Sequence, residues 1–226
     1  MKKLSFYEQV GIVIPGSVLV FGLVLLEPKL QVVFAKDGIT VGGFGIFVFL
    51  AYASGHLVAA LGNLLEFCMW GLLGGMPSNW VVDEKSPLLS DQQISLLKNA
   101  LHSRLKINVP VVGMAKAEWN KVYQLLYRDV LANKASRAET FNGNYGLNRG
   151  LAAATLALSI LVLILAPDKW DYSLVLVMMS AVLLYRAYRF GVHFAREIYA
   201  GFLLLSHQPP TRHGRRQKQR GSTSTP

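Results

Sequence analysis

Three polar side chains interrupt the apolar stretch from Phe44 to Leu73. A helix needs roughly 20 apolar residues to cross a bilayer core, so this longer stretch is predicted to span a membrane and extend into water. His56, Asn63 and Glu66 lie within it, and at helical spacing they share one arc of about 120°. Polar groups at membrane depth are unfavourable without partners. The arc therefore either forms hydrogen bonds between helices or takes a direct part in permeation or ligand sensing.

Small residues lie on the same arc as these polar side chains. Gly55, Ala59 and Gly62 are spaced so that another helix can approach closely, and Tyr52 shares the arc. Protein or water is expected on this side. The opposite side is apolar and is expected to face lipid; its residues are Leu57, Val58, Leu61, Leu64 and Leu65.

Four basic residues after the last apolar stretch share one helix face. Arg186, Arg189, His193 and Arg196 are three, four and three positions apart, a spacing that aligns them on a helix. The planar guanidinium of arginine suits phosphate and carboxylate groups. The face therefore has two interpretations: a collar that touches lipid headgroups, or a specific site for a nucleotide or for an acidic surface of a partner.

Glu66 requires a cationic partner if it is buried near the inner membrane boundary. A buried carboxyl without such a partner would take up a proton. Arginines lie near the expected membrane boundary in the third and fourth apolar stretches. We therefore expect Glu66 to pair with Arg149 or Arg186.

Signals for catalysis are weak. The chain contains no HExxH, GxSxG, Walker A or GxGxxG motif. The adjacent residues Ser54, Gly55 and His56 point about 100° apart on a helix, so a nucleophile and a base do not meet there. Cys68 is the single cysteine, which excludes an intrachain disulfide and a cysteine-rich zinc site. The sequence predicts no enzyme, no cofactor and no metal site.

Composition places the chain among membrane proteins. Of its 226 residues, 52% are hydrophobic and only 16% are charged, and the net charge is +10. An excess of basic residues suits contact with the anionic membrane lipid of an inner leaflet, and it also suits a nucleotide or nucleic-acid partner.

Apolar runs and helix breakers divide the chain into five segments. The first run is predicted to remain as an uncleaved span, with a kink or a late helix start at Pro15 and Gly16. A short connection over residues 27–43 is expected, with Gly38, Gly42 and Gly43 as breakers. The expected segments are an interfacial N-terminus (1–9), a first transmembrane hairpin with a long second helix (10–73), a cytoplasmic helical insert (74–149), a second hairpin with an extended fourth helix (150–205) and a basic disordered tail (206–226).

The middle segment carries two predicted helices. Ser90 and Gln93 match a capping box, and helical spacing of leucines continues from there until Pro110 and Gly113 end the helix. The second helix is expected over residues 114–134, with one apolar face formed by Trp119, Val122, Tyr123, Leu126 and Val130. A breaker cluster over residues 142–146 is expected to precede the third span, which Pro167 closes and a tight turn over residues 168–171 follows.

Lysine and arginine counts predict the orientation of the spans, because cytoplasmic segments carry the excess. The first connection between spans holds Lys29 and Lys36, and the last holds only Lys169, so the other 20 of 23 lie elsewhere. Both termini and the middle segment are therefore expected to be cytoplasmic. This arrangement requires an even number of spans.

Three strings resemble a group of bacterial inner-membrane proteins: FYEQVGIVIPG at the start, YASGHLVAALGNLLE in the second apolar stretch and RAETFNGNYGLNR before the third. Members of this group have two hairpins of spans around a cytoplasmic helical insert, and some belong to phage-defence gene neighbourhoods. The resemblance therefore implies the same arrangement and a role in defence. It brings no established activity.

The sequence predicts an all-α integral membrane protein with four transmembrane helices in two hairpins and a cytoplasmic helical layer. We expect a homo-oligomer in the bacterial inner membrane, because four spans enclose little volume and small-residue faces favour association. Two functions remain open. The first is an oligomeric effector or pore component with the polar arc facing its interior. The second is a non-conducting anchor that recruits a cytoplasmic protein or nucleic-acid partner through its basic inner surface.

Overall fold

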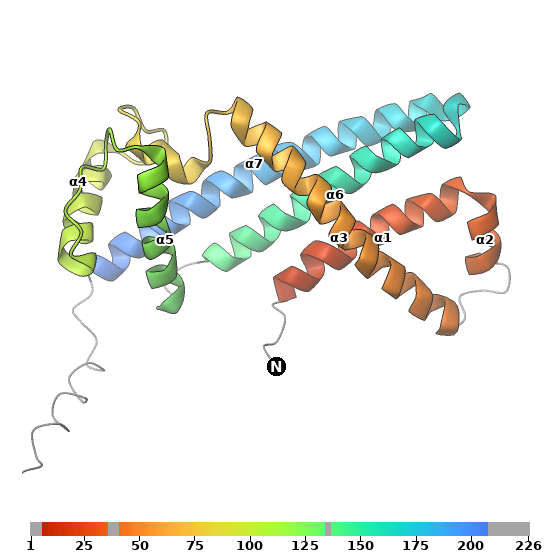
Figure 1. The fold of residues 1–226 in the computed structure, drawn as a ribbon, viewed down its shortest axis with the longest axis horizontal. Coiled ribbons are helices and arrows are strands. Elements are labelled where there is room, and N and C mark those ends of the chain that lie inside the picture. Colours follow the sequence, from red (N-terminus) through yellow and green to blue (C-terminus); the bar gives the residue numbers. More distant parts are fainter. Residues whose placement is uncertain (1–5, 36–40, 134–136, 208–226) are drawn as a thin grey trace, which may run out of the picture. The chain divides into compact units, whose positions relative to one another are not determined.

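The computed structural model describes residues 6–35, 41–133 and 137–207, and every regular element in these ranges is a helix. Figure 1 shows these helices, which form two compact units. The described residues of the first unit lie within 6–77 and 137–194, and those of the second within 78–133 and 195–207. The all-helical class expected from the sequence is confirmed.

The first unit contains the helices that are apolar enough to cross a membrane. By length and composition α3, α6 and α7 qualify, and α1 holds a shorter apolar stretch, Val10–Leu26. Three helices in the described ranges are thus long and apolar enough to cross a membrane, which is compatible with the membrane class expected from the sequence. The elements that contribute to this unit are α1 (Phe6–Leu26), α2 (Pro28–Ala35), α3 (Val41–Leu72), α6 (Ala138–Leu165), the short turn η3 (Pro167–Lys169) and α7 (Trp170–His207), which the second unit shares.

Glycines bring α1 against both α3 and α6. A methyl group on Gly16 of α1 would lie only 2.6 Å from the backbone nitrogen of Gly55 on α3. A methyl group on Gly150 of α6 would lie 2.8 Å from Cγ of Pro15. These contacts leave no room for a Cβ, so the helix backbones approach more closely than larger residues would permit.

Serine hydroxyls join α6 to α7. Ser173 donates to the carbonyl of Ser159 at 3.0 Å, and Ser180 donates to the carbonyl of Ala152 at 2.9 Å. The two bonds show that the helices run in opposite directions, side by side, as Figure 1 also shows. Both serines are buried, and a backbone carbonyl satisfies each hydroxyl without water.

The first connection and the first helix differ from the expectation. Helix α1 begins at Phe6 and continues through Pro15, so it does not start late. The connection contains the eight-residue helix α2, and Gly42 and Gly43 lie in the first turn of α3 instead of breaking it. Gly38 lies outside the described residues. Proline and glycine are tolerated here because close packing and helix ends compensate for their low helix propensity.

The sequence predicted a breaker cluster over residues 142–146, and this prediction is wrong. Helix α6 begins at Ala138 and runs through these residues. Asn144 donates to the carbonyl of Thr140 at 2.9 Å, and Asn148 donates to the carbonyl of Asn144 at 2.7 Å. These asparagines bond back to the preceding turn of the same helix. The low helix propensity of these glycines and asparagines therefore does not end the helix.

The second unit contains the predicted capping box. Ser90 Oγ accepts from the backbone N–H of Gln93 at 3.4 Å, and Gln93 Oε1 accepts from the backbone N–H of Ser90 at 3.0 Å. The prediction of this helix start is confirmed. The elements are η1 (Pro77–Val82), α4 (Asp91–Ala100), the wider turn η2 (Leu101–Leu105), α5 (Lys116–Ala132) and the last turns of α7.

The ends of the two middle helices are set by particular residues. The helical segment α4–η2 ends at Lys106, which has a left-handed backbone with φ of 59°, and not at Pro110 as expected. Helix α5 lies within the predicted range and buries its predicted apolar face. The fully or nearly fully buried members of that face are Trp119, Val122, Leu126 and Val130.

Candidate functional site

An ion pair joins α3 and α6 at the position expected for the membrane boundary. Arg149 Nη1 contacts Glu66 Oε2, and both side chains are mostly buried, at 21% and 16% exposure. A methyl group on Gly62 would lie 3.5 Å from Cγ of Arg149, so the arginine stem runs past this glycine. Arg149, one of the two arginines expected to pair with Glu66, therefore forms the ion pair.

Aromatic residues extend this pair toward α7. The Arg149 guanidinium lies 5.6 Å from the ring centroid of Tyr145, and Trp70 Nε1 donates to the Tyr145 hydroxyl at 2.9 Å. A methyl group on Gly191 would lie 2.8 Å from the Trp70 ring, so α7 also packs on the tryptophan. We call Glu66, Trp70, Tyr145 and Arg149 the boundary network. It holds three helices of the first unit together.

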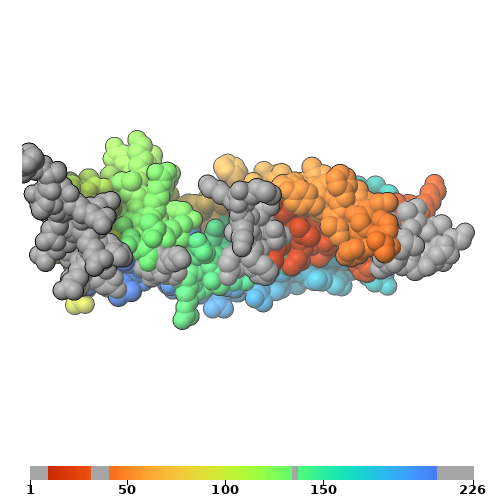
Figure 2. All heavy atoms as spheres, turned by 90° about the horizontal axis from the view of Figure 1, so that it is seen from below, coloured from red at the N-terminus to blue at the C-terminus, as the bar shows by residue number. Residues whose placement is uncertain are grey.

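The polar arc of α3 divides between a buried side and an exposed side. Glu66 enters the boundary network, whereas His56 and Asn63 are exposed and Tyr52 is 46% exposed. The Tyr52 and His56 rings meet edge to face, with centroids 4.8 Å apart. Figure 2 shows the orange atoms of α3 at the surface beside the red atoms of α1. Glu66 therefore pairs with a neighbouring helix, whereas His56 and Asn63 lie on the surface of the described part of the single chain.

The rotation of α3 explains this difference. Ala51, Gly55, Val58 and Gly62 form its buried face, because the tight crossing with α1 requires small residues there. Val58, which was expected to face lipid, is fully buried against Ala153 and Ala154. Of the other residues on the side expected to face lipid, Leu57, Leu61 and Leu64 are exposed, and Leu65 packs partly buried against the Val58 cluster.

The three small residues of the arc differ in their surroundings. A methyl group on Gly55 would lie 2.7 Å from Cγ2 of Ile12, so this position is in direct contact with α1. Gly62 adjoins Arg149 at ordinary contact distance. Ala59 is only half-buried.

The four basic residues of α7 belong to both units, three to the first and one to the second. Within the first unit, Arg186 and Arg189 are exposed, the Arg186 guanidinium lies 5.8 Å from the ring centroid of Phe190, and His193 stacks on Phe141. Within the second unit, Arg196 Nη2 donates to the carbonyl of Pro87 at 3.2 Å. The shared helix face predicted from spacing thus contains side chains with separate neighbours.

The second unit contains a buried polar cluster that the sequence did not predict. Trp119 Nε1 donates to the carbonyl of Ser78 at 2.8 Å, and the Tyr199 hydroxyl donates to the same carbonyl at 2.6 Å. The Tyr123 ring lies 5.6 Å from the Tyr199 ring, and its buried hydroxyl has no hydrogen-bond partner among the described residues. Burial raises the pKa of Tyr123. The helical spacing of Trp119 and Tyr123 was visible in the sequence, but their partners on distant segments were not.

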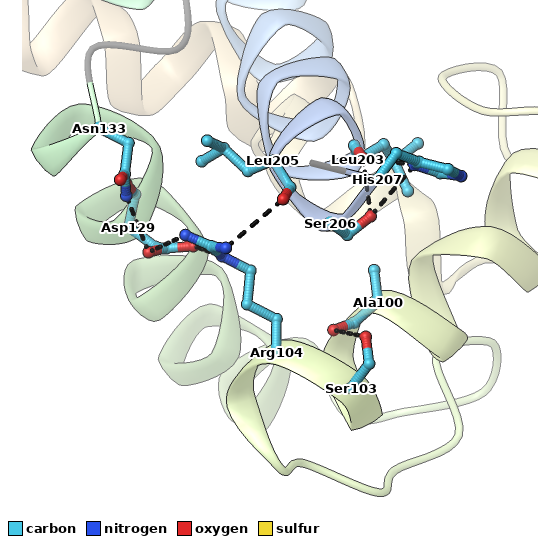
Figure 3. A network of polar contacts seen from close by, with 9 residues as sticks. All are labelled: Ala100, Ser103, Arg104, Asp129, Asn133, Leu203, Leu205, Ser206 and His207. Atoms are coloured by element: carbon cyan, nitrogen blue, oxygen red, sulfur yellow. Dashed lines mark hydrogen bonds and ion pairs between the residues drawn. The ribbon is translucent and has the colours of Figure 1, made fainter. Parts of the chain in front are cut away.

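An arginine clamp holds the end of α7 in the second unit (Figure 3). Arg104 Nη2 donates to Asp129 Oδ1 at 3.1 Å, and its Nε donates to the other carboxylate oxygen. Its Nη1 reaches the carbonyl of Leu205 at 3.5 Å, in the last turn of α7. A cation suits the carbonyl end of a helix. The hydrogen bond with Asp129 raises the pKa of Arg104, so the clamp remains charged.

The fold and the sites define a class: an all-helical protein with long apolar helices suited to a membrane, two of which, α3 and α6, are joined by a mostly buried ion pair. In the described ranges, no group of three His, Cys, Asp or Glu side chains could hold a metal ion. No protein-family model, curated protein or solved structure matches the chain.

Proposed function

We propose that the protein is an oligomeric effector or pore component of the bacterial inner membrane, in which α1, α3, α6 and α7 cross as two hairpins. One observation supports this most directly: Tyr52, His56 and Asn63 lie exposed on a helix that is apolar enough to span a membrane. Lipid does not satisfy such polar groups. Other copies of the chain, or water in a lumen, would satisfy them.

The position of His56 along α3 supports a location inside the hydrocarbon region. The 32 residues of α3 extend over about 48 Å, which exceeds the roughly 30 Å of a bilayer core. His56 lies near the middle of the helix and ten residues before Glu66, or about 15 Å along the axis. If the boundary network lies at the inner edge of the membrane, His56 lies near mid-depth.

The second unit would act as the cytoplasmic layer that receives a signal. Helix α7 contributes residues to both units, so it provides a covalent connection between them. The Arg104 clamp fixes the end of this helix within the second unit. The role in phage defence rests on the resemblance of the three sequence strings.

Ion flux through liposomes containing the purified full chain would test the pore. We expect His56→Ala and Glu66→Gln to abolish flux while membrane insertion is retained, with Leu57→Ala as a lipid-facing control that leaves flux unchanged. Normal flux in both variants would overturn the role of the arc. A wild-type protein that inserts and assembles but conducts no ions would overturn the pore.

The exposure of Arg186, Arg189 and Arg196 favours a second function, a non-conducting anchor that recruits an acidic partner. Charge reversal at Arg189 and Arg196, or removal of the tail after Gln208, is then expected to release that partner. Unchanged co-purification of the partner would count against this function.

A further inference from the structure

We propose that α3 packs in parallel against α3 of a second copy of this chain. The contact surface is a seam of residues that share one face of the helix. This inference rests on the proposed membrane-crossing oligomer and identifies where the copies meet. The seam consists of Gly45, Phe49, Tyr52, His56, Ala59 and Asn63.

The spacing of the seam is that of a helix-packing surface. Its positions alternate by four and three residues, the pattern by which two helices keep one face together along a left-handed crossing. Transmembrane helices commonly pack with this geometry. The seam continues over about five turns, which is most of the span.

Most of the seam is not covered by the described residues of the other helices, and only Ala59 is half-buried. Phe49 is 71% exposed, and His56, Asn63 and Gly45 are exposed as well. A methyl group on Gly45 would meet no atom within 4 Å. The face that packs on α1 and α6 is a different one, formed by residues such as Gly55 and Val58.

The polar members of the seam match copies of themselves. Chains inserted in the same orientation bring same-numbered residues of parallel helices to the same depth. Histidine, asparagine and tyrosine side chains each contain a hydrogen-bond donor and an acceptor, so each can bond its own counterpart. His56 can therefore meet His56, and Asn63 can meet Asn63, without any further partner. A seam asparagine also fixes the register of parallel helices.

The rest of the exposed α3 surface explains why this face, and not another, is covered. Leu57, Leu61 and Leu64 are exposed on a different side and are satisfied by lipid. The small residues Gly45 and Ala59 on the seam allow two helices to approach closely. The second copy thus removes polar groups from lipid and fills the space beside these small residues.

Disulfide cross-linking of the full chain in native membranes tests the seam. Cys68 is exposed, so a Cys68→Ser background provides single-cysteine variants at Tyr52, His56 and Asn63. Matched controls have the cysteine at Leu57 or Leu64. Mild oxidation is expected to give covalent dimers from the seam positions and none from the two leucine positions.

The native mass of the wild-type protein, measured without cross-linking, shows whether the protein is an oligomer at all. The cross-links then show whether the copies meet at the seam. An oligomer that cross-links through Leu57 or Leu64, and not through the seam, would overturn the seam and leave the oligomer intact. A monomer without cross-links at any position would overturn both. Seam cysteines that react with a membrane-impermeant thiol reagent without forming dimers would identify a water-filled lumen and overturn the contact.

A second variant avoids any effect of the introduced cysteines. His56→Leu retains an apolar span but loses the self-complementary side chain, and we expect it to weaken self-association by roughly threefold to thirtyfold. Leu57→Ala is expected to leave association unchanged. Equal association constants for His56→Leu and the wild type would contradict a contact at His56.

Discussion

At the scale of single residues, Glu66 and Arg149 form a mostly buried ion pair in the first unit. Both groups are mostly withdrawn from water, so each depends on the other. Removing one partner from a buried pair leaves an uncompensated charge, whereas replacing both by apolar residues of similar size can be nearly neutral. The pair therefore joins one face of α3 to one face of α6.

Arg149→Met is expected to destabilise the protein by about 3 to 5 kcal/mol, because Glu66 loses its counter-charge. The double variant Glu66→Leu with Arg149→Met should recover most of the loss. Thermal unfolding in detergent measures both, with exposed Arg186→Gln as a control that changes little. A single variant as stable as the wild type would show that the pair contributes nothing.

Two tyrosines of the second unit differ in the hydrogen bonding of their hydroxyl groups. The Tyr199 hydroxyl donates to the carbonyl of Ser78 and accepts from Trp119, whereas the buried Tyr123 hydroxyl has no partner in the part of the chain that the structure describes. A buried polar group without a hydrogen bond is unfavourable, and removing it relieves that cost.

Tyr199→Phe is therefore expected to lower the free energy of unfolding by about 1 to 3 kcal/mol, and Tyr123→Phe to leave it unchanged or raise it. Chemical denaturation of the two variants in the same detergent measures the contrast. Equal losses in both variants would refute the difference in hydrogen bonding.

The raised pKa of Tyr123 predicts a loss of stability in alkali. The unfolded chain releases this proton near pH 10, whereas the folded chain still retains it. Stability is therefore fully present below about pH 10 and falls as the pH rises toward the folded pKa. Tyr123→Phe should show a smaller alkaline decline than the wild type in unfolding midpoints measured across this range.

At the scale of elements, glycines fix how the first unit packs. Gly16 and Gly55 lie where α1 and α3 cross, and a methyl group on either would overlap backbone atoms of the other helix. Backbone atoms cannot move aside as a flexible side chain can. The same contacts set the rotation of α3 that exposes His56 and Asn63.

Gly16→Ala and Gly55→Ala are each expected to destabilise the helix bundle by about 1 to 3 kcal/mol through overpacking. Gly71→Ala is the matched control, because a methyl group there meets nothing within 4 Å and improves helix propensity. Thermal unfolding in detergent compares the three. Gly16→Ala or Gly55→Ala behaving like Gly71→Ala would contradict the close crossing.

At the scale of the whole molecule, the charge distribution agrees with a membrane orientation. The turn between α6 and α7 contains one basic residue, Lys169, whereas the middle segment and the C-terminal part are rich in lysine and arginine. Basic segments are retained on the cytoplasmic side. The proposed four-span arrangement thus places the turn outside and both termini inside.

Fusions to alkaline phosphatase, which is active only outside the inner membrane, are expected to be active after Lys169. Fusions after Asn133 or at the C-terminus should be inactive. Green fluorescent protein at the same sites should give the opposite pattern. High phosphatase activity at the C-terminus would indicate an odd number of spans.

Local signals in the sequence determined the helical class of this protein and the existence of most of its long helices. Apolar stretches of sufficient length predicted the candidate spans, and the Ser90–Gln93 pair predicted the start of α4. The apolar face of α5 was predicted by its spacing as well. These features depend on residues close together in the chain, so no tertiary contact is required to find them.

Only the tertiary structure decided which faces meet. Whether Arg149 or Arg186 pairs with Glu66, and whether residues 142–146 break or continue α6, depends on segments far apart in the sequence. The exposure of His56 has the same origin, because the crossing of α1 at Gly55 fixes the rotation of α3. Helical periodicity gives the relative angles of side chains, but close packing against other helices sets the absolute direction.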